Sequence, residues 1–325
     1  MRATGGHQGK HTLRFLSAQC RNLTARCGAI ILGVFDRLYT LDSVTKEATV
    51  APSDGSSRTD TYWSRPHLAE ALLDAVAASG LDLRAATPDA LAPLDKFHGG
   101  GKEATRTLAR QAEVAAGMRV LDVGGGLGGP ARMLAVEYGA RVTVLDLTAD
   151  YLRAGALLTA RLGLAEQVHF CHGNALALPF PDCSFDLVWT QNSGMQIADK
   201  ARLYGGFFRV LRAGGRLAQL EPVAGPVQPP HFPLMWAREP TDSHLLSAAG
   251  LRETMTATGF SARSWNPAIR FPEPAASAAD TAHTIQRLIM GERLTAIREA
   301  GARNAAEDRL HSVLVVCERT AYRSP

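Results

Sequence analysis

Cysteine is scarce in this sequence, and its few copies form no recognisable pairing. Five cysteines are scattered over the 325 residues, an odd number that includes no C-x-x-C pair. This usage argues against a disulfide framework and against a structural zinc site, and it is typical of proteins in a reducing compartment. We therefore predict a cytoplasmic protein that binds no metal.

Long apolar runs and a strong excess of charge are also missing. The best apolar stretch, "CGAIILGVF" (Cys27–Phe35), is too short to span a membrane. The net charge of +4 favours neither nucleic acid nor an anionic membrane surface as a partner. H-E-x-x-H, G-x-S-x-G and clustered carboxylates are absent, and "GGGKEAT" (Gly99–Thr105) lacks the first glycine of a phosphate-binding loop. We therefore expect no membrane span, no nucleic-acid partner and no hydrolase of these types.

The first 35 residues contain several basic residues and no acidic residue. Such a segment is either an organelle-targeting peptide or a disordered extension, and we favour the extension. Turn-forming residues from Thr49 to Asp60 predict a linker. We expect three parts, which are an extension over residues 1–58, a helical cap over 59–110 and a ligand-binding domain over 111–325.

Strands and helices alternate from Met118 onwards. The spacing predicts strands over 118–124, 141–148, 167–174, 184–191, 215–223, 259–266 and 311–320, and helices between them. Alternation with short connections predicts an α/β fold with a doubly wound sheet, parallel strands and helices on both faces. Such a sheet binds its ligand at the carboxyl ends of its strands, where strand order reverses.

The turn after the first predicted strand, "LDVGGGLGGPARMLA" (Leu121–Ala135), fits two cofactor motifs. It matches the G-x-G-x-x-G fingerprint of dinucleotides, and Asp122, Gly124, Gly126 and Gly128 match an acidic-x-G-x-G-x-G loop for S-adenosylmethionine. A carboxylate at Asp122 would repel a pyrophosphate but would attract the ammonium of an amino acid. Either cofactor would place ribose hydroxyls on Asp146, at the end of the second predicted strand.

The region after the third predicted strand favours S-adenosylmethionine. Asn174 at the strand end is positioned to read the adenine edge, while Leu147 and Ala175 press on the faces of the ring. "RVLRAGGRLA" then supplies a tight turn into the fifth predicted strand. In order and spacing, residues 60–266 resemble the class I S-adenosylmethionine-dependent methyltransferases of the type 11 group. They are similar to sarcosine and dimethylglycine N-methyltransferases and to quinone C-methyltransferases.

The resemblance implies a seven-stranded Rossmann-like methyltransferase sheet with an N-terminal helical cap. It also implies cofactor contacts at Gly124, Gly126, Gly128 and Asp146, with Asn174 standing where the family usually has Asp. "DKFH" and "MQIADK" replace the commoner "DQFH" and "MNIADK". These departures lie where the acceptor or the methionine would be contacted.

Candidate acid–base and acceptor residues come from the cap and from the sheet edge. His98 is either a general base or a group that hydrogen-bonds its own turn. Gln191 and Gln196 follow the fourth predicted strand, where they either orient ligands or cap the next helix. Tyr62, His231 and Trp236 are acceptor candidates, and packing is the alternative role of Tyr62 and Trp236.

These observations predict an enzyme that transfers a methyl group to a nitrogen, carbon or oxygen of a small molecule. A nicotinamide-dependent oxidoreductase is the first alternative, although the Tyr-x-x-x-Lys proton donor it requires is missing. The second is a non-catalytic subunit that only binds S-adenosylmethionine. Helical residues from 280 to 310 pack on the core or on a second subunit, which leaves a homodimer open.

Overall fold

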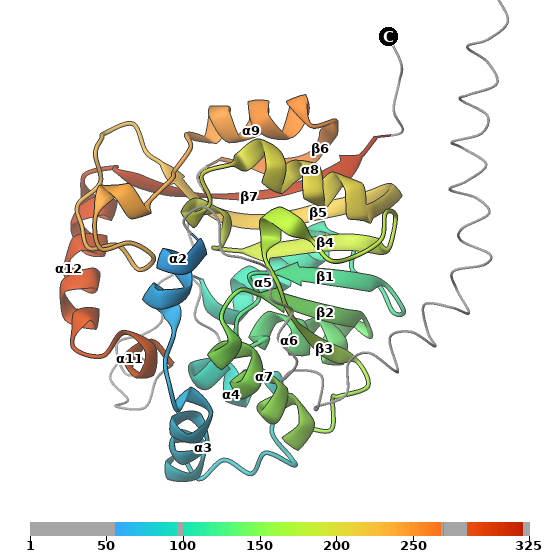
Figure 1. Ribbon diagram of the computed structural model, residues 1–325, viewed down its shortest axis with the longest axis vertical. Helices are drawn as coiled ribbons and strands as arrows, with labels where there is room; N and C mark the ends of the chain where they lie inside the picture. The colour runs from blue at the N-terminus through green and yellow to red at the C-terminus, as the bar shows by residue number, and fades with distance from the viewer. Residues whose placement is uncertain (1–55, 96–99, 268, 270–284, 321–325) are drawn as a thin grey trace, which may run out of the picture. The chain divides into compact units, whose positions relative to one another are not determined.

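The computed structural model describes residues 56–95, 100–267, 269 and 285–320 (Figure 1). The expected extension lies outside these residues except for its last three, and so does His98. Helix α2 (Ser56–Trp63) includes Ser56–Asp60, for which we predicted a linker. That part of the prediction is wrong, because Tyr62 is buried in an apolar cluster and tertiary packing outweighs weak local helix propensity.

A seven-stranded sheet in the order β3-β2-β1-β4-β5-β7-β6 forms the centre of the described chain. Its strands are β1 (Arg119–Val123), β2 (Arg141–Asp146), β3 (Val168–His172), β4 (Phe185–Gln191), β5 (Leu211–Ala224), β6 (Phe260–Asn266) and β7 (Leu310–Arg319). The first five strands are parallel, and β7 runs antiparallel between β5 and β6. The prediction of a doubly wound α/β sheet is confirmed, and strand order reverses between β1 and β4.

The remaining helices precede β1 or connect the strands. They are α3 (Leu68–Ala78), α4 (Pro88–Asp95), α5 (Gly101–Gln111), α6 (Gly129–Tyr138), α7 (Ala149–Arg161), α8 (Lys200–Val210), α9 (Ala248–Ala257), α11 (Ile285–Met290) and α12 (Arg293–Ala306). Short 3-10 turns are η2 (Ala175–Ala177), η3 (Gly194–Gln196) and η4 (Pro240–Asp242). In the part of the chain that the structure describes, no helix has the length and apolarity that a membrane crossing requires.

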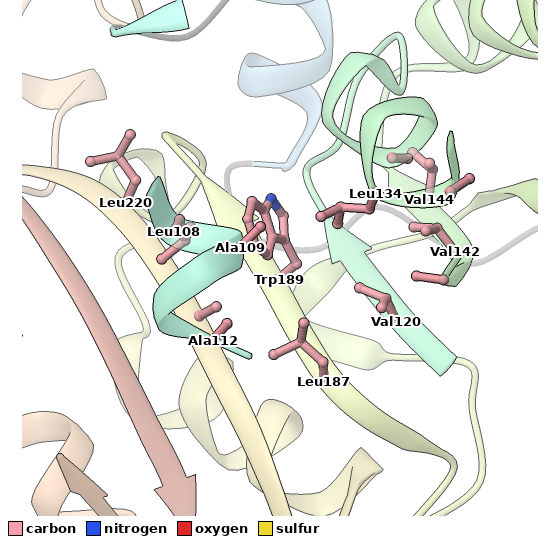
Figure 2. Packing of buried hydrophobic residues seen from close by; sticks show 14 of the residues in the cluster. Leu108, Ala109, Ala112, Val120, Leu134, Val142, Val144, Leu187, Trp189 and Leu220 are labelled. Carbon is pink, nitrogen blue, oxygen red and sulfur yellow. The ribbon is translucent and has the colours of Figure 1, made fainter. Parts of the chain in front are cut away.

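Helices cover both faces of the sheet. On one face, Trp189 and Leu187 of β4 pack with Leu108 of α5 and Leu134 of α6 (Figure 2). On the other face, Cys317 of β7 contacts Met255 of α9, and the Tyr204 hydroxyl of α8 lies 3.1 Å from Oε1 of Gln219 in β5. Because side chains alternate along a strand, each central strand buries both of its faces.

A buried ion pair attaches the end of α4 to α6, beside the glycine turn. Nη2 of Arg132 in α6 lies 3.1 Å from Oδ2 of Asp95, the last residue of α4, and both side chains are 1% exposed. Nη1 of Arg132 donates to Oγ1 of Thr159 at 2.8 Å. A Cβ on Gly129 would lie 2.2 Å from the carbonyl oxygen of Asp95, so only glycine permits this approach. The start of α6 is therefore held directly against the end of α4.

Replacement of Arg132 by Met should lower the free energy of unfolding by about 3–5 kcal/mol, because it leaves the Asp95 carboxylate buried without its cation. Chemical denaturation of the full chain measures this loss. The matched control is Arg153→Met, which removes an exposed partner 3.6 Å from Asp150 and should cost about 1 kcal/mol or less. Equal losses in the two variants would show that the buried pair does not stabilise the fold.

Candidate functional site

A large cleft opens at the carboxyl ends of β1, β2, β3 and β4. Its volume is about 2320 Å³, and its walls include α2, the residues around Trp236 and part of α12. This exceeds the roughly 300–1,000 Å³ of a usual small-molecule pocket. The lining includes most of the predicted site residues, which are Tyr62, Asp122, Gly124, Gly126, Asp146, Leu147, Asn174, Ala175, Gln191, Gln196 and Trp236. The cleft therefore has room for two ligands side by side.

The glycine turn presents bare backbone to the cleft. Gly124, Gly126 and Gly128 have φ angles of 69°, 54° and 76°, in the left-handed region that other residues avoid. A Cβ on Gly124 would lie 2.4 Å from that of Ser193. Gly128 does not line the cleft; a Cβ there would lie 2.9 Å from the ring of Phe170. The first two glycines thus border the ligand space, whereas Gly128 lets α6 approach β3.

Asp122 is a buried carboxylate without compensation. It lies near the end of β1, is 1% exposed, and its Oδ2 has no hydrogen-bond partner among the described residues. Burial, together with the negative charge of Asp146, raises the pKa of Asp122 to about 8. Among the described residues, the amides of the glycine turn therefore donate no hydrogen bond to this oxygen. A buried carboxylate oxygen that borders a cleft fits a cationic ligand group.

Asp146 is held in place by the backbone around it. Its Oδ2 accepts a hydrogen bond from the amide of Gly126, and its Oδ1 accepts one from the amide of Thr148, both at 2.9 Å. Burial raises the pKa of Asp146, and these backbone hydrogen bonds act in the opposite direction. Each carboxylate oxygen keeps a further acceptor site that can take a hydroxyl of a ligand.

Asn174, which follows β3, also has a structural role. Oδ1 of Asn174 accepts a hydrogen bond from the amide of Leu176 at 2.8 Å and so caps η2. Asn174 and Ala175 line the cleft, as does Leu147, whose carbonyl oxygen is 2.8 Å from Nε2 of His172. The oxygen that we expected beside an adenine edge is thus already oriented by the chain.

The amide of Gln191 is fixed in one orientation. Its Oε1 lies 3.1 Å from Nε1 of Trp189, which donates to it, and 3.3 Å from Oγ1 of Thr105. Its Nε2 is buried without a hydrogen-bond partner, and the residue is 8% exposed and lines the cleft. Because the oxygen is held by two donors, the unused amino group remains as a donor for a ligand.

Three segments far apart in the sequence meet across the cleft. Nε1 of Trp63 donates to Oε1 of Gln196 at 2.9 Å, and Nε2 of Gln196 donates to the carbonyl of Trp236 at 3.3 Å. The hydroxyl of Tyr62 donates to the carbonyl of Met235 at 2.9 Å. The end of α2, η3 and the chain near residue 236 thus form a bridge, which brings together the predicted Tyr62, Gln196 and Trp236.

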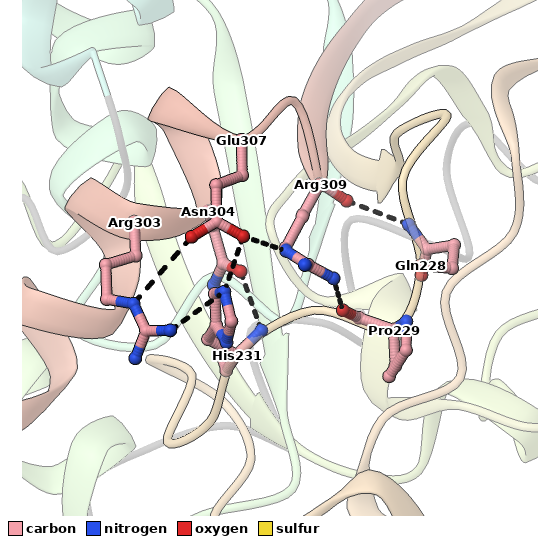
Figure 3. A network of polar contacts seen from close by, with 7 residues as sticks. All are labelled: Gln228, Pro229, His231, Arg303, Asn304, Glu307 and Arg309. Atoms are coloured by element: carbon pink, nitrogen blue, oxygen red, sulfur yellow. Dashed lines mark hydrogen bonds and ion pairs between the residues drawn. The ribbon is translucent and has the colours of Figure 1, made fainter.

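His231 lies elsewhere. It does not line the cleft, and its Nε2 lies 2.8 Å from Oε2 of Glu307 (Figure 3). Its backbone amide donates to Oδ1 of Asn304 at 2.7 Å, and the side chain of Arg309 contacts both Glu307 and the carbonyl of Pro229. This network attaches the loop after β5 to the end of α12, which is a structural role.

Sequence reasoning missed a buried carboxyl in β5, Glu221, and a histidine that lines the cleft, His244. Glu221 is buried and its pKa is raised to about 7 by burial, an effect that the positive charge of Lys200 opposes. His244 lines the cleft, and its backbone amide donates to the carbonyl of Met195 at 2.8 Å. Burial and the charge of Lys200 lower the pKa of His244, so its imidazole is neutral near pH 7. The sequence marks Glu221 only as a charged residue inside the mostly apolar run "LAQLEPV". No local pattern marks His244 as a residue of the cleft.

Comparisons with known proteins agree with this geometry. Residues 120–215 match a family model described as a methyltransferase domain. A glycine/sarcosine/dimethylglycine N-methyltransferase of Actinopolyspora halophila is 30% identical over 132 residues, which are 41% of this chain and 23% of that protein. A 2-methyl-6-phytyl-1,4-hydroquinone methyltransferase of Synechocystis is 40% identical over 101 residues, 31% of each chain. The chain therefore spans less than a third of the length of these two relatives.

Solved structures show the same fold at low identity. A phosphoethanolamine N-methyltransferase of Haemonchus contortus, in complex with S-adenosyl-L-methionine, has a TM-score of 0.59 at 20% identity and covers 72% of this chain and 58% of its own. A structure described as a sarcosine dimethylglycine methyltransferase of Galdieria sulphuraria has a TM-score of 0.53 at 17% identity, with 67% and 84% covered. At these identities the likeness concerns the fold alone.

Replacement of Asp122 by Asn should make the protein more stable at alkaline pH. The pKa of Asp122 is raised on folding, so the stability due to its proton is complete at acid pH and is lost as pH rises through about 8. Asn carries no charge, so the variant avoids this loss, which is on the order of a few kcal/mol. Denaturation at pH 5 and pH 9 measures the effect. A stability difference that does not grow with pH would contradict it.

Proposed function

We propose that this chain, whose residues 120–215 form a methyltransferase domain of the S-adenosylmethionine-dependent class, transfers the methyl group of S-adenosylmethionine to a small-molecule acceptor. The observation that carries the proposal is the buried Asp122 oxygen without a partner beside the glycine turn. The ammonium of the cofactor's methionine part would supply the missing partner. The same carboxylate, when ionised, disfavours a pyrophosphate, and with it the nicotinamide alternative.

The residues around the cleft fit the other parts of the cofactor. The amides of the glycine turn and the side chain of Gln191 would bind the methionine part, and Asp146 would accept hydrogen bonds from the ribose hydroxyls. Leu147 and Ala175 would contact the adenine faces, with Asn174 at its edge. When bound, the sulfonium supplies a methyl group that is already an excellent electrophile, so the protein's main task is to position the nucleophile.

The chain itself provides orientation and shielding. The bridge from Trp63 through Gln196 to Trp236 closes one side of the cleft and limits the entry of water. A nucleophile that arrives protonated needs a proton acceptor. Among the described residues, His244 is neutral near pH 7, lines the cleft and is attached to η3, so we assign it this task. His98 stays a prediction.

Binding and turnover assays test the proposal. Calorimetry should detect S-adenosylmethionine and S-adenosylhomocysteine at micromolar concentrations, without binding of NADH. Incubation of the protein and labelled S-adenosylmethionine with a metabolite extract should then yield a labelled product detectable by mass spectrometry. Binding without any methylated product would favour the non-catalytic subunit, and NADH binding alone would refute the proposal.

Replacement of Asp146 by Ala should weaken S-adenosylhomocysteine binding about 10- to 100-fold, because ribose hydroxyls lose a charged acceptor and the Gly126 amide loses its partner. Calorimetric titration measures the dissociation constant. Asp182→Ala is the control, since Asp182 is exposed and lies outside the cleft lining. An unchanged dissociation constant for the Asp146 variant would remove this residue from the site.

Cofactor binding should release a proton and strengthen with rising pH. A bound cation favours ionised Asp122, so its pKa falls below about 8 on binding, and affinity rises by up to about tenfold per pH unit. Calorimetry between pH 5.5 and 7, in buffers with different ionisation enthalpies, counts the proton released. The Asp122→Asn variant should lose this dependence, and a dependence that survives the substitution would implicate another group.

A further inference from the structure

Positively charged side chains gather around Tyr62 at one wall of the cleft. The guanidinium carbon of Arg293 lies 5.1 Å from the centre of the Tyr62 ring, and that of Arg238 lies 5.7 Å from it. Arg65 follows directly after α2, and its Nη1 donates to the carbonyl of Tyr62 at 3.0 Å. We call Arg65, Arg238 and Arg293 the Tyr62 arginine cluster. Its members come from three separate segments of the chain.

The part of the chain that the structure describes supplies the cluster with no counter-ion. Within the residues that the structure describes, no carboxylate oxygen lies within 4.0 Å of a guanidinium nitrogen of Arg65, Arg238 or Arg293. Nη2 of Arg65 and Nη1 of Arg293 are buried without a hydrogen-bond partner. The carboxylate nearest in sequence to Arg238, that of Glu239, accepts a hydrogen bond from Thr241. Arg65 and Arg293 are half-buried, and the other nitrogens of Arg65 donate to backbone carbonyls, so each of these two residues keeps one buried donor for an anion.

The electrostatic surroundings of Arg65 also favour a bound anion. Burial lowers the pKa of its guanidinium, and the positive charges of Arg293 and Arg238 lower it further, against opposing effects of Tyr151 and Tyr62. Asp150 does not relieve this repulsion through an ion pair, because it accepts from the backbone amide of Arg65 and pairs with Arg153. An anion near the cluster would remove an unfavourable interaction that the folded chain contains.

The cluster faces the space left for the acceptor. Arg238 and Tyr62 line the cleft, and so does Arg58, one helical turn before Tyr62. Arg65 and Arg293 do not line it, although their positive charges act on Tyr62. Asp122 and Asp146, in contrast, belong to the strand-end wall of the cleft. The cleft lining thus carries both signs of charge, and it also includes the carboxylates of Glu239 and Asp242, close to Arg238 in sequence.

We infer that the Tyr62 arginine cluster binds an anionic group of the methyl acceptor, a carboxylate or a phosphate, with Arg238 in direct contact. This inference rests on the proposed function, and it narrows the acceptor to molecules that carry such a group. A guanidinium binds planar carboxylate and phosphate oxygens through two parallel hydrogen bonds. The anion would tether the acceptor at the cap, while its nucleophilic atom extends toward the glycine turn.

Anion titrations of the full chain test the inference. The probes are inorganic pyrophosphate and benzoate, added at low ionic strength with and without saturating S-adenosylhomocysteine. Fluorescence of Trp63 and Trp236, which lie on either side of Gln196, and calorimetry report binding. Arg238→Gln removes an exposed cleft-lining charge without disturbing the core. Arg161→Gln is the matched control, because Arg161 is exposed and does not line the cleft.

At least one probe should bind saturably to the wild type, and Arg238→Gln should weaken that binding about tenfold or more. Arg161→Gln should leave it unchanged. Preference for pyrophosphate indicates a phosphate-bearing acceptor, and preference for benzoate indicates a carboxylate. Absence of binding by both probes, or equal loss in both variants, would overturn the inference. Failure of S-adenosylhomocysteine to bind refutes the proposed function instead, and the titrations without it still decide whether the cluster binds anions.

Discussion

The site is organised around the cost of burying the carboxylate of Asp122 without a partner. A charge removed from water must be paired, neutralised or compensated by a ligand, and here the raised pKa of the carboxyl shows that the chain itself provides no compensation. The carboxyl stays at this position because it lies near the end of β1, a strand buried on both faces. Bare glycine backbone surrounds it, since a Cβ on Gly125 would lie 2.6 Å from its Oδ2. The fold thus maintains a locally unfavourable group that the ammonium of the proposed cofactor would relieve.

The residues around Tyr62 also carry uncompensated charge, which in their case is positive. Among the described residues, the guanidinium groups around Tyr62 have no carboxylate within 4.0 Å, just as Asp122 has no cation. The two walls are joined by the bridge from Trp63 to Trp236, whose hydrogen bonds connect the cap to the loops after β4 and β5. A cofactor with a cationic end and an acceptor with an anionic end would neutralise both walls together.

Local patterns predicted the sheet and the glycine turn well, because strand periodicity and left-handed glycines depend on neighbours in the sequence. They did not predict α2, where packing of Tyr62 outweighs weak local propensity. They did not show that Asn174 caps η2 or that His231 is bound to α12, since each depends on a particular folded contact. The Tyr62 arginine cluster joins residues 65, 238 and 293, and His244 reaches the cleft from a loop without periodicity. Long-range contacts of this kind leave no signature in a single sequence.

The amide of Gln191 connects the hydrophobic core to the chemistry of the site. Trp189 packs against α5 and α6, yet its indole N–H also determines which end of the Gln191 amide meets the cleft. A phenylalanine at that position would fill much of the same space but would remove one of the two donors that orient the amide. Position 189 therefore requires both the volume of the tryptophan side chain and the hydrogen-bond donor of its indole. We therefore expect fewer residue types to be tolerated at position 189 than at position 187, although Trp189 and Leu187 are equally buried.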